Sequence, residues 1–256
     1  MASTGVDLTS LLRPVRQGNA FEETVERLLM VIKLGLVAPG QRFPAERELA
    51  AQLGISRITL RDAIRELQQA GYVESRRGRF GGTFITYTPP APDQGELRRL
   101  ARADESKLAD ALTFRLAVET GASQVLAALL TRQRSDDPGA GDRPDGWQDA
   151  REVLLARLAE VNGAGPQDYR RLDTLFHLSI AELTGSSLLA AACADARMRL
   201  NDLLGAIPVL QRNIDHTAGQ HTAIVEAILA GEPERARRAV AEHLDGTAAL
   251  LRGFLA

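Results

Sequence analysis

Three of the four histidines and one aspartate have a spacing that predicts a metal site. Asp173 and His177 are four residues apart, so on a helix their side chains are neighbours on one face. His221 and His243 each lie eleven residues from Glu232, which sits in a Gly-Glu-Pro break between two helical patterns. In an antiparallel helical hairpin these two histidines would therefore be level with each other. Three imidazoles and one carboxylate suit zinc, with nickel and manganese as alternatives, and leave positions open for water or a ligand.

All four side chains fall on the apolar faces of their predicted helices. A buried polar group costs a few kcal/mol unless it finds a partner. A single such histidine is best explained as a hydrogen-bonded core residue. Three histidines and an aspartate on inward faces together favour a shared metal ion. His216 lies off this pattern and is predicted at the surface or in a loop. The apolar neighbours that define the faces are Leu172, Phe176, Ile180 and Leu183, then Ile224, Val225 and Ile228, then Ala236, Ala239, Val240 and Leu250.

The elements that must position these residues are helices. From about residue 96 onward strand patterns are absent and amphipathic helical patterns dominate. A segment rich in Pro, Gly and Asp at 135–146 predicts a loop between helices. The predicted helices lie near 106–132, 147–161, 167–184, 187–205, 215–230 and 233–254.

The front of the chain predicts a different kind of domain. A helix over 20–35 precedes a second helix that starts at Pro44 and stops at Gly54. Ser56 is suited to cap a third helix that runs to about Ala70. Two strands, 72–74 and 83–85, flank a basic tip at 75–82. A helix, a short turn, a second helix and a basic hairpin in this order predict a winged helix-turn-helix.

The third helix of this domain has one buried face and one face suited to DNA. Leu60, Ala63, Ile64 and Leu67 share an arc that should be buried. Arg57, in the first turn, can bind a guanine edge or a phosphate, and Ser56 and Thr59 can bond phosphate oxygens. Exposed Ile58 could touch a thymine methyl group. The alternative is that the arginines only solvate a small helical domain.

Residues 36–85 resemble the winged-helix domain of the GntR family of regulators. The resemblance is carried by Pro39-Gly40, residues 44–50 (Pro-Ala-Glu-Arg-Glu-Leu-Ala), Ser56-Arg57, Arg61, Leu67, Gly71 and Gly82-Thr83-Phe84. Phe43 stands where the family usually has leucine, which should affect packing only. The resemblance implies that the DNA-contacting residues are Arg47, Ser56, Arg57, Thr59, Arg61 and Gly78.

Residues 96–254 resemble the FCD-type effector domain of the FadR subfamily of GntR regulators. The matching residues are 114–119 (Phe-Arg-Leu-Ala-Val-Glu), 173–177 (Asp-Thr-Leu-Phe-His), His221 with Ala227-Ile228, and His243. The resemblance implies that Asp173, His177, His221 and His243 ligate a metal and that an organic acid completes its shell. Arg115 is the first candidate to bind the acid, with an ion pair to Glu119 as its alternative role. Arg197 and Asn201 are further candidates.

The length of the chain fits two domains. The distribution of charge suggests that only the first half of the chain binds a polyanion. Residues 1–88 hold 12 Lys+Arg against 9 Asp+Glu, a net +3, whereas the remainder holds 19 against 24, a net −5. We expect a flexible tail at 1–19, a winged-helix domain at 20–88, a Pro-rich linker at 89–95 and an all-helical domain at 96–256. A single cysteine, Cys193, allows no intrachain disulfide, and no run of residues is apolar enough for a signal peptide or a bilayer span. We therefore expect a cytoplasmic protein that does not bind membranes.

The sequence as a whole predicts a transcription factor whose affinity for a double-stranded DNA operator is controlled by a small carboxylate metabolite. An operator with two-fold symmetry has two half-sites, and each is bound by one winged-helix domain. This predicts a homodimer. One alternative is a metal-free sensor of an acyl-CoA-type ligand. Another is a metal-dependent hydrolase, although the sequence offers no general base or nucleophile motif for it. The sequence does not identify the effector or the operator, and it does not decide between repression and activation.

Overall fold

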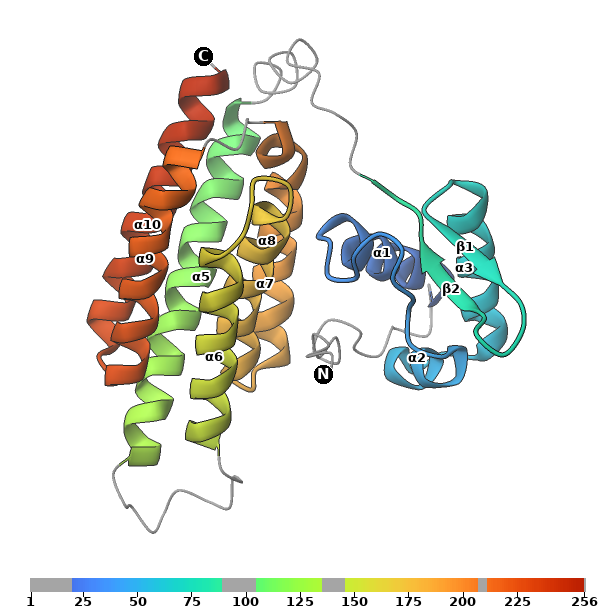
Figure 1. Cartoon of the computed structure of the whole chain (residues 1–256), viewed down its shortest axis with the longest axis horizontal. Helices are drawn as coiled ribbons and strands as arrows, with labels where there is room; N and C mark the ends of the chain where they lie inside the picture. The colour runs from blue at the N-terminus through green and yellow to red at the C-terminus, as the bar shows by residue number, and fades with distance from the viewer. Residues whose placement is uncertain (1–19, 89–104, 135–145, 207–210, 256) are drawn as a thin grey trace. The chain divides into compact units, whose positions relative to one another are not determined.

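The computed structural model describes residues 20–88, 105–134, 146–206 and 211–255 (Figure 1). The chain divides into two compact units, Met1–Pro90 and Ala91–Ala256. This division falls within the segment predicted as a linker. The predicted tail at 1–19 and the predicted linker at 89–95 lie outside the described residues.

The first unit has the predicted order of elements, and the winged helix-turn-helix is confirmed. Its helices pack around a core to which α3 contributes Leu60, Ala63, Ile64 and Leu67, each at most 6% exposed. These are the four residues that the sequence placed on the buried face. The elements are α1 (Ala20–Lys33), α2 (Glu46–Leu53), α3 (Arg57–Gln69), β1 (Val73–Arg76) and β2 (Gly82–Ile85).

The turn between α2 and α3 is formed by a left-handed glycine and a capping serine. Gly54 has φ +64°, a conformation that costs glycine little and other residues more. Ser56 caps α3, because its Oγ accepts the backbone N–H of Thr59 at 3.0 Å. The predicted start of α2 at Pro44 is wrong by two residues. Ala45 is extended, with ψ 142°, so the helix begins only at Glu46.

The wing is a two-stranded antiparallel hairpin. Val73 pairs with Ile85 at its base, both buried, and Arg76 pairs with Gly82 next to the tip. The tip closes with a bond from the Gly81 N–H to the Gly78 carbonyl at 2.9 Å, and Gly78 has φ +103°. The corner residues of this turn are therefore Arg79 and Phe80.

The second unit is a bundle of helices throughout its described part. Figure 1 shows α5 running between α9 and α10 on one side and α6, α7 and α8 on the other, and α5 packs against all five. The helices are α5 (Glu105–Arg134), α6 (Gly146–Asn162), α7 (Tyr169–Leu183), α8 (Ser187–Ala206), α9 (Gln211–Ala230) and α10 (Pro233–Leu255). They match the predicted segments to within a few residues. Among the described residues, no helix is both long and apolar enough to cross a bilayer.

The hairpin that joins α9 to α10 is held against α5. Thr131 on α5 donates a hydrogen bond to the Gly231 carbonyl at 2.8 Å. Gly231 has φ +70°, and a Cβ atom there would lie 2.3 Å from Thr131 Oγ1. Both the positive φ and the close approach of Thr131 favour glycine at position 231. The hydrogen bond from Thr131 holds the α9–α10 turn against α5.

Candidate metal centre and nucleic-acid interface

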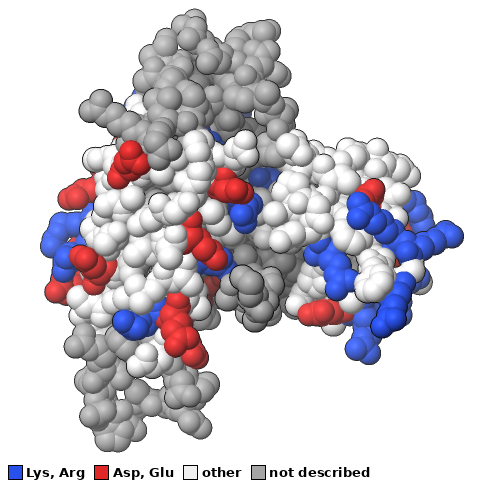
Figure 2. All heavy atoms as spheres, in the orientation of Figure 1, with Lys and Arg blue, Asp and Glu red and all other residues white. Residues whose placement is uncertain are grey.

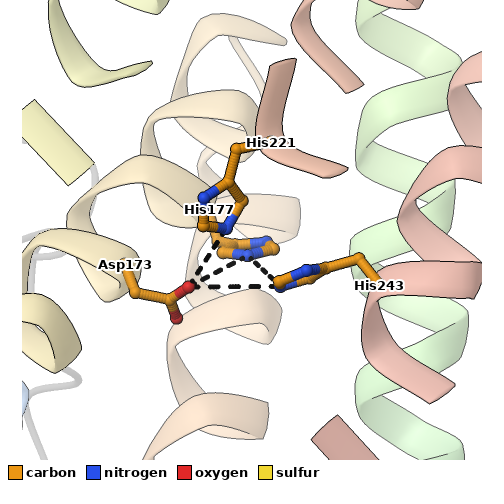
Figure 3. A group of neighbouring side chains, drawn as sticks. All are labelled: Asp173, His177, His221 and His243. Carbon is orange, nitrogen blue, oxygen red and sulfur yellow. Dashed lines mark hydrogen bonds and ion pairs between the residues drawn. The ribbon is translucent and has the colours of Figure 1, made fainter. Parts of the chain in front are cut away.

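The four residues predicted as metal ligands converge inside the helical unit (Figure 3). Asp173 and His177 come from α7, His221 from α9 and His243 from α10, and one ligand atom from each lies within 4.8 Å of the others. The three histidines are at most 3% exposed. The rings of His221 and His243 have centroids 4.7 Å apart, as their equal distance from the hairpin predicted. His216 is exposed on α9 and takes no part.

The ligand atoms face one another at separations that suit a single ion. Asp173 Oδ1 lies 3.3 Å from His221 Nε2, 3.7 Å from His177 Nε2 and 4.0 Å from His243 Nε2. His177 Nε2 and His243 Nε2 are 3.1 Å apart. Bonds of about 2.0–2.2 Å from one metal ion would place two of its ligand atoms about 3.0–4.4 Å apart, depending on the angle between the bonds. All four separations fall in this range.

His177 presents a lone pair, and not a proton, to the centre. Its Nδ1 lies 2.9 Å from Glu119 Oε2, and an ionised carboxylate only accepts hydrogen bonds. Burial and the nearby Arg197 lower the pKa of His177 from 6.5 to about 4, against the opposing effect of Glu119 and Asp173. At neutral pH the ring therefore carries one proton, which sits on Nδ1, and Nε2 is free to bind a cation.

His243 is oriented in the same way when the Gln220 side-chain amide presents its oxygen to the ring. Its Nδ1 lies 3.1 Å from Gln220 Oε1, which is an acceptor. Burial and the neighbouring His177 hold the pKa of His243 well below 6.5. Two Nε2 lone pairs thus face each other at 3.1 Å beside a carboxylate oxygen. The two lone pairs, 3.1 Å apart, and the Asp173 oxygen, 3.7 and 4.0 Å from them, repel one another unless a cation lies among them.

His221 adds an observation of the same kind. Both of its ring nitrogens are buried, and neither has a hydrogen-bond partner among the described residues. A buried imidazole without partners is costly, and a bond from Nε2 to a metal ion would offset part of this cost. The residues present therefore fit a divalent metal ion.

Two arginines and a glutamate lie beside the centre, all buried. Glu119 Oε1 lies 2.9 Å from Arg115 Nε and 3.0 Å from Arg197 Nε. Arg197 also binds Asp173 Oδ2 through Nη1 at 3.1 Å and Thr174 at 3.3 Å. Burial alone would raise the pKa of Glu119, but Arg115, Arg197 and His177 together lower it well below its ordinary value.

Asp173 is ionised by the same balance. Burial would raise its pKa, but the neighbouring His177, His221 and Arg197 side chains lower it well below its ordinary value. A negatively charged Asp173 is the form that a metal ion binds.

The residues predicted to bind the effector differ in how they are occupied. Arg197 already bonds three partners. Arg115 bonds Glu119 through Nε, while its buried Nη1 has no partner within the described structure. Asn201 is half-buried on α8, one turn beyond Arg197. The predicted ion pair of Arg115 with Glu119 is therefore present, and Nη1 takes no part in it.

The winged-helix unit carries a basic face. Figure 2 shows Lys and Arg side chains (blue) gathered over this unit. The residues predicted to contact DNA are all on its surface, since Thr59 is half-exposed and Arg47, Ser56, Arg57, Arg61 and Gly78 are exposed. Ile58 is 73% exposed on the same side of α3.

Glu46 organises the arginines of this face, and sequence analysis did not single it out. Its Oε2 lies 2.8 Å from Arg61 Nε and 3.9 Å from Arg57 Nη2. A carboxylate on α2 therefore positions two cationic side chains on α3. Glu46 reaches these arginines because α2 packs against α3, which its spacing from them in the sequence does not reveal.

The wing tip carries an exposed aromatic ring that was also missed. Phe80 is 83% exposed, and the Arg79 guanidinium lies 5.7 Å from its ring centroid. Arg76 stacks on Phe84 at 4.4 Å and pairs with Glu74. The tip therefore offers both cations and an apolar group to a partner.

A winged helix with a basic face, followed by a helical domain with a buried cluster of ligand atoms, defines a DNA-binding protein of the regulator class. Residues 21–85 match the model of bacterial regulatory proteins of the gntR family, and residues 110–246 match that of the FCD domain. The chain belongs to the GntR family and carries an FCD domain. It is a DNA-binding transcriptional regulator; its family and relatives are regulators and not enzymes.

Similar proteins include a protein named as the HTH-type transcriptional regulator RmpR of Mycobacterium gastri, 30% identical over 86% of this chain and 76% of that one. A protein named for regulation of the L-lactate dehydrogenase operon of Escherichia coli K12 is 29% identical over 91% and 86%. The repressor NanR of Escherichia coli is 26% identical over 94% and 88%. The solved structure of Escherichia coli McbR/YncC is 16% identical, covers 92% of this chain and 98% of its own, and has a TM-score of 0.47.

Proposed function

We propose that the helical domain senses a small carboxylate metabolite at a divalent metal ion, and that binding of the metabolite changes the affinity for an operator. Asp173, His177, His221 and His243 would hold the ion, which we take to be zinc, with nickel and manganese as alternatives. When bound, the ion would supply an electrophilic position for a carboxylate oxygen.

One observation carries this proposal. Ligand atoms from three helices converge within the core, and Arg115, which Glu119 links to His177, has a buried Nη1 without a partner among the described residues. A carboxylate is the group that would satisfy both, because one oxygen can bind a metal while the other accepts from a guanidinium. Arg197 would hold Asp173 in place, and Asn201 remains a candidate to contact the rest of the metabolite.

We propose further that Arg47, Ser56, Arg57, Thr59, Arg61 and Gly78 contact the operator, and that the protein acts as a homodimer. The exposure of these residues on α2, α3 and the wing supports the contacts. A homodimer would present two winged helices to the two half-sites of an operator with two-fold symmetry. The dimer would exist in two states, one in which the spacing of the two winged-helix domains fits the operator and one in which it does not. The metabolite would shift the equilibrium between these states.

The test is a thermal-shift screen of organic acids, with and without a chelator. L-lactate is a natural first acid, since a relative is named for the L-lactate dehydrogenase operon, and citrate is a second. An active acid should raise the melting temperature of the zinc-loaded protein through mass action. It should not do so after chelation, nor in Arg115→Met, whereas Arg199→Met, which alters an exposed arginine of α8, should respond normally.

The same thermal-shift experiment tests the alternative, a metal-free sensor of an acyl-CoA-type ligand. A purified wild-type protein that binds no metal and is stabilised by an acyl-CoA would overturn the proposal. The effect on DNA is measured by fluorescence anisotropy with an operator duplex that the protein has selected from a random DNA pool. An acid that stabilises the protein without changing this affinity would also contradict the proposal.

A further inference from the structure

We propose that Glu119 is a positioning residue of the metal centre, which fixes the tautomer of His177 so that Nε2 can bind the ion. This inference rests on the proposed function, because it assigns a role toward the metal proposed there. It concerns a buried carboxylate on α5 that is not itself one of the four ligands.

The two oxygens of Glu119 have different partners. Oε1 accepts from Arg115 Nε at 2.9 Å and lies 3.0 Å from Arg197 Nε. Oε2 lies 2.9 Å from His177 Nδ1, with Arg197 Nη2 more distant at 3.4 Å. The guanidinium groups are donors only, so they hold the carboxylate in one orientation, with Oε2 directed at His177.

The bond to His177 sets where the ring proton lies. Because Oε2 only accepts, Nδ1 must donate and the lone pair is left on Nε2, which points at the other ligand atoms. Glu119 also joins the centre to Arg115, whose Nη1 we assign to the metabolite. A single carboxylate therefore determines both the metal-binding state of His177 and the position of the effector-binding arginine.

A purely structural role is the competing explanation, in which Glu119 only neutralises two buried arginines. The variant Glu119→Gln separates the two. Arg115, whose Nε donates to Oε1, would retain the amide oxygen at that position, because a guanidinium offers only donors, whereas the Arg197 Nη2 bond to Oε2 at 3.4 Å would be lost. The amide NH2 would then face His177 Nδ1 and donate to it, which would move the ring proton to Nε2. The structural role predicts no such exchange.

The experiment uses the metal-free full-length protein, labelled with 15N, and records long-range proton–nitrogen correlations of the four histidines. Wild-type His177 should be protonated on Nδ1, and His177 in Glu119→Gln should be protonated on Nε2. Zinc affinity, measured by competition with a chromophoric chelator, should fall roughly 10–100-fold in Glu119→Gln. The control Asp110→Asn removes a carboxylate from the exposed face of the same helix and should change neither result.

Failures of the inference and of the proposed function are distinguishable. If the wild type binds zinc but its His177 is protonated on Nε2 without metal, Glu119 does not set the tautomer. The same holds if Glu119→Gln keeps both the wild-type tautomer and the wild-type zinc affinity. If Glu119→Gln fails to fold, the wild-type tautomer alone decides. A wild-type protein that binds no zinc would instead overturn the proposed function.

Discussion

Replacing Arg197 with methionine should destabilise the helical domain far more than any exposed arginine can. Arg197 is 2% exposed and binds both Glu119 and Asp173. Removing one partner of a buried ion pair costs about 3–5 kcal/mol, because the remaining charge is left uncompensated. Here Glu119 keeps Arg115, and the Asp173 side chain is 17% exposed and so keeps some contact with water. We therefore expect a loss of about 3–4 kcal/mol, a fall in Tm of roughly 6–16 °C for a domain of this size.

The matched control is Arg199→Met on the same helix. Arg199 pairs with Asp195 at 3.0 Å, but these side chains are 56% and 43% exposed, so the loss should be at most about 1 kcal/mol. Urea unfolding with chelator present removes any contribution of metal. Far-UV circular dichroism follows the transition, because the described part of the second unit is helical. Equal losses in the two variants would refute the claim that the Arg197 pairs are buried and uncompensated when broken.

Three further perturbations have defined outcomes. In chelator-treated protein, His177 alone should account for a fall of about 3 kcal/mol in stability as the pH is lowered from 6.5 to about 4, because it takes a proton in the unfolded chain but not in the folded one; His243, whose pKa is also lowered, adds to this fall. His177→Gln should lack this component in urea titrations across the range, and an unchanged slope would contradict the assignment. Gly231→Ala should cost about 1–3 kcal/mol, since the alanine would need a positive φ and would clash with α5, whereas Gly219→Ala, with open space around it, should be neutral or stabilising by up to about 1 kcal/mol. Arg79→Ala should lower the salt dependence of DNA affinity by about one phosphate contact. Phe80→Ala should weaken binding without changing that slope, because a phenyl ring displaces no counterion, and a matching change in slope would count against a contact through the ring.

Periodicity and spacing predicted the elements and the ligand cluster because both depend on local geometry. The i, i+4 spacing put Asp173 and His177 on one face of α7. The equal distances from Glu232 put His221 and His243 at one height, since residues equidistant from a short turn lie level in an antiparallel helical hairpin. The capping role of Ser56 followed from its residue type directly before an amphipathic pattern.

The residues that hydrogen-bond to the histidine ligands could not be predicted in the same way. Glu119 meets His177 only because α5 packs against α7, and Gln220 meets His243 only across the α9–α10 hairpin. Each looks like an ordinary polar residue in its own helix. Glu119 was noticed only as a neighbour of Arg115 one turn away. The start of α2 was misplaced because Pro44 suits a first helical turn, whereas the extended Ala45 that follows it delays the helix.

The metal content of the purified protein tests the central claim most directly. Elemental analysis by mass spectrometry, after dialysis against zinc and then metal-free buffer, should find about one zinc per wild-type chain. The variant His221→Ala should retain far less, and His216→Ala, which alters an exposed histidine of the same helix, should retain as much as the wild type. Wild-type protein without bound metal, or equal retention in all three proteins, would contradict the assignment of these side chains as ligands.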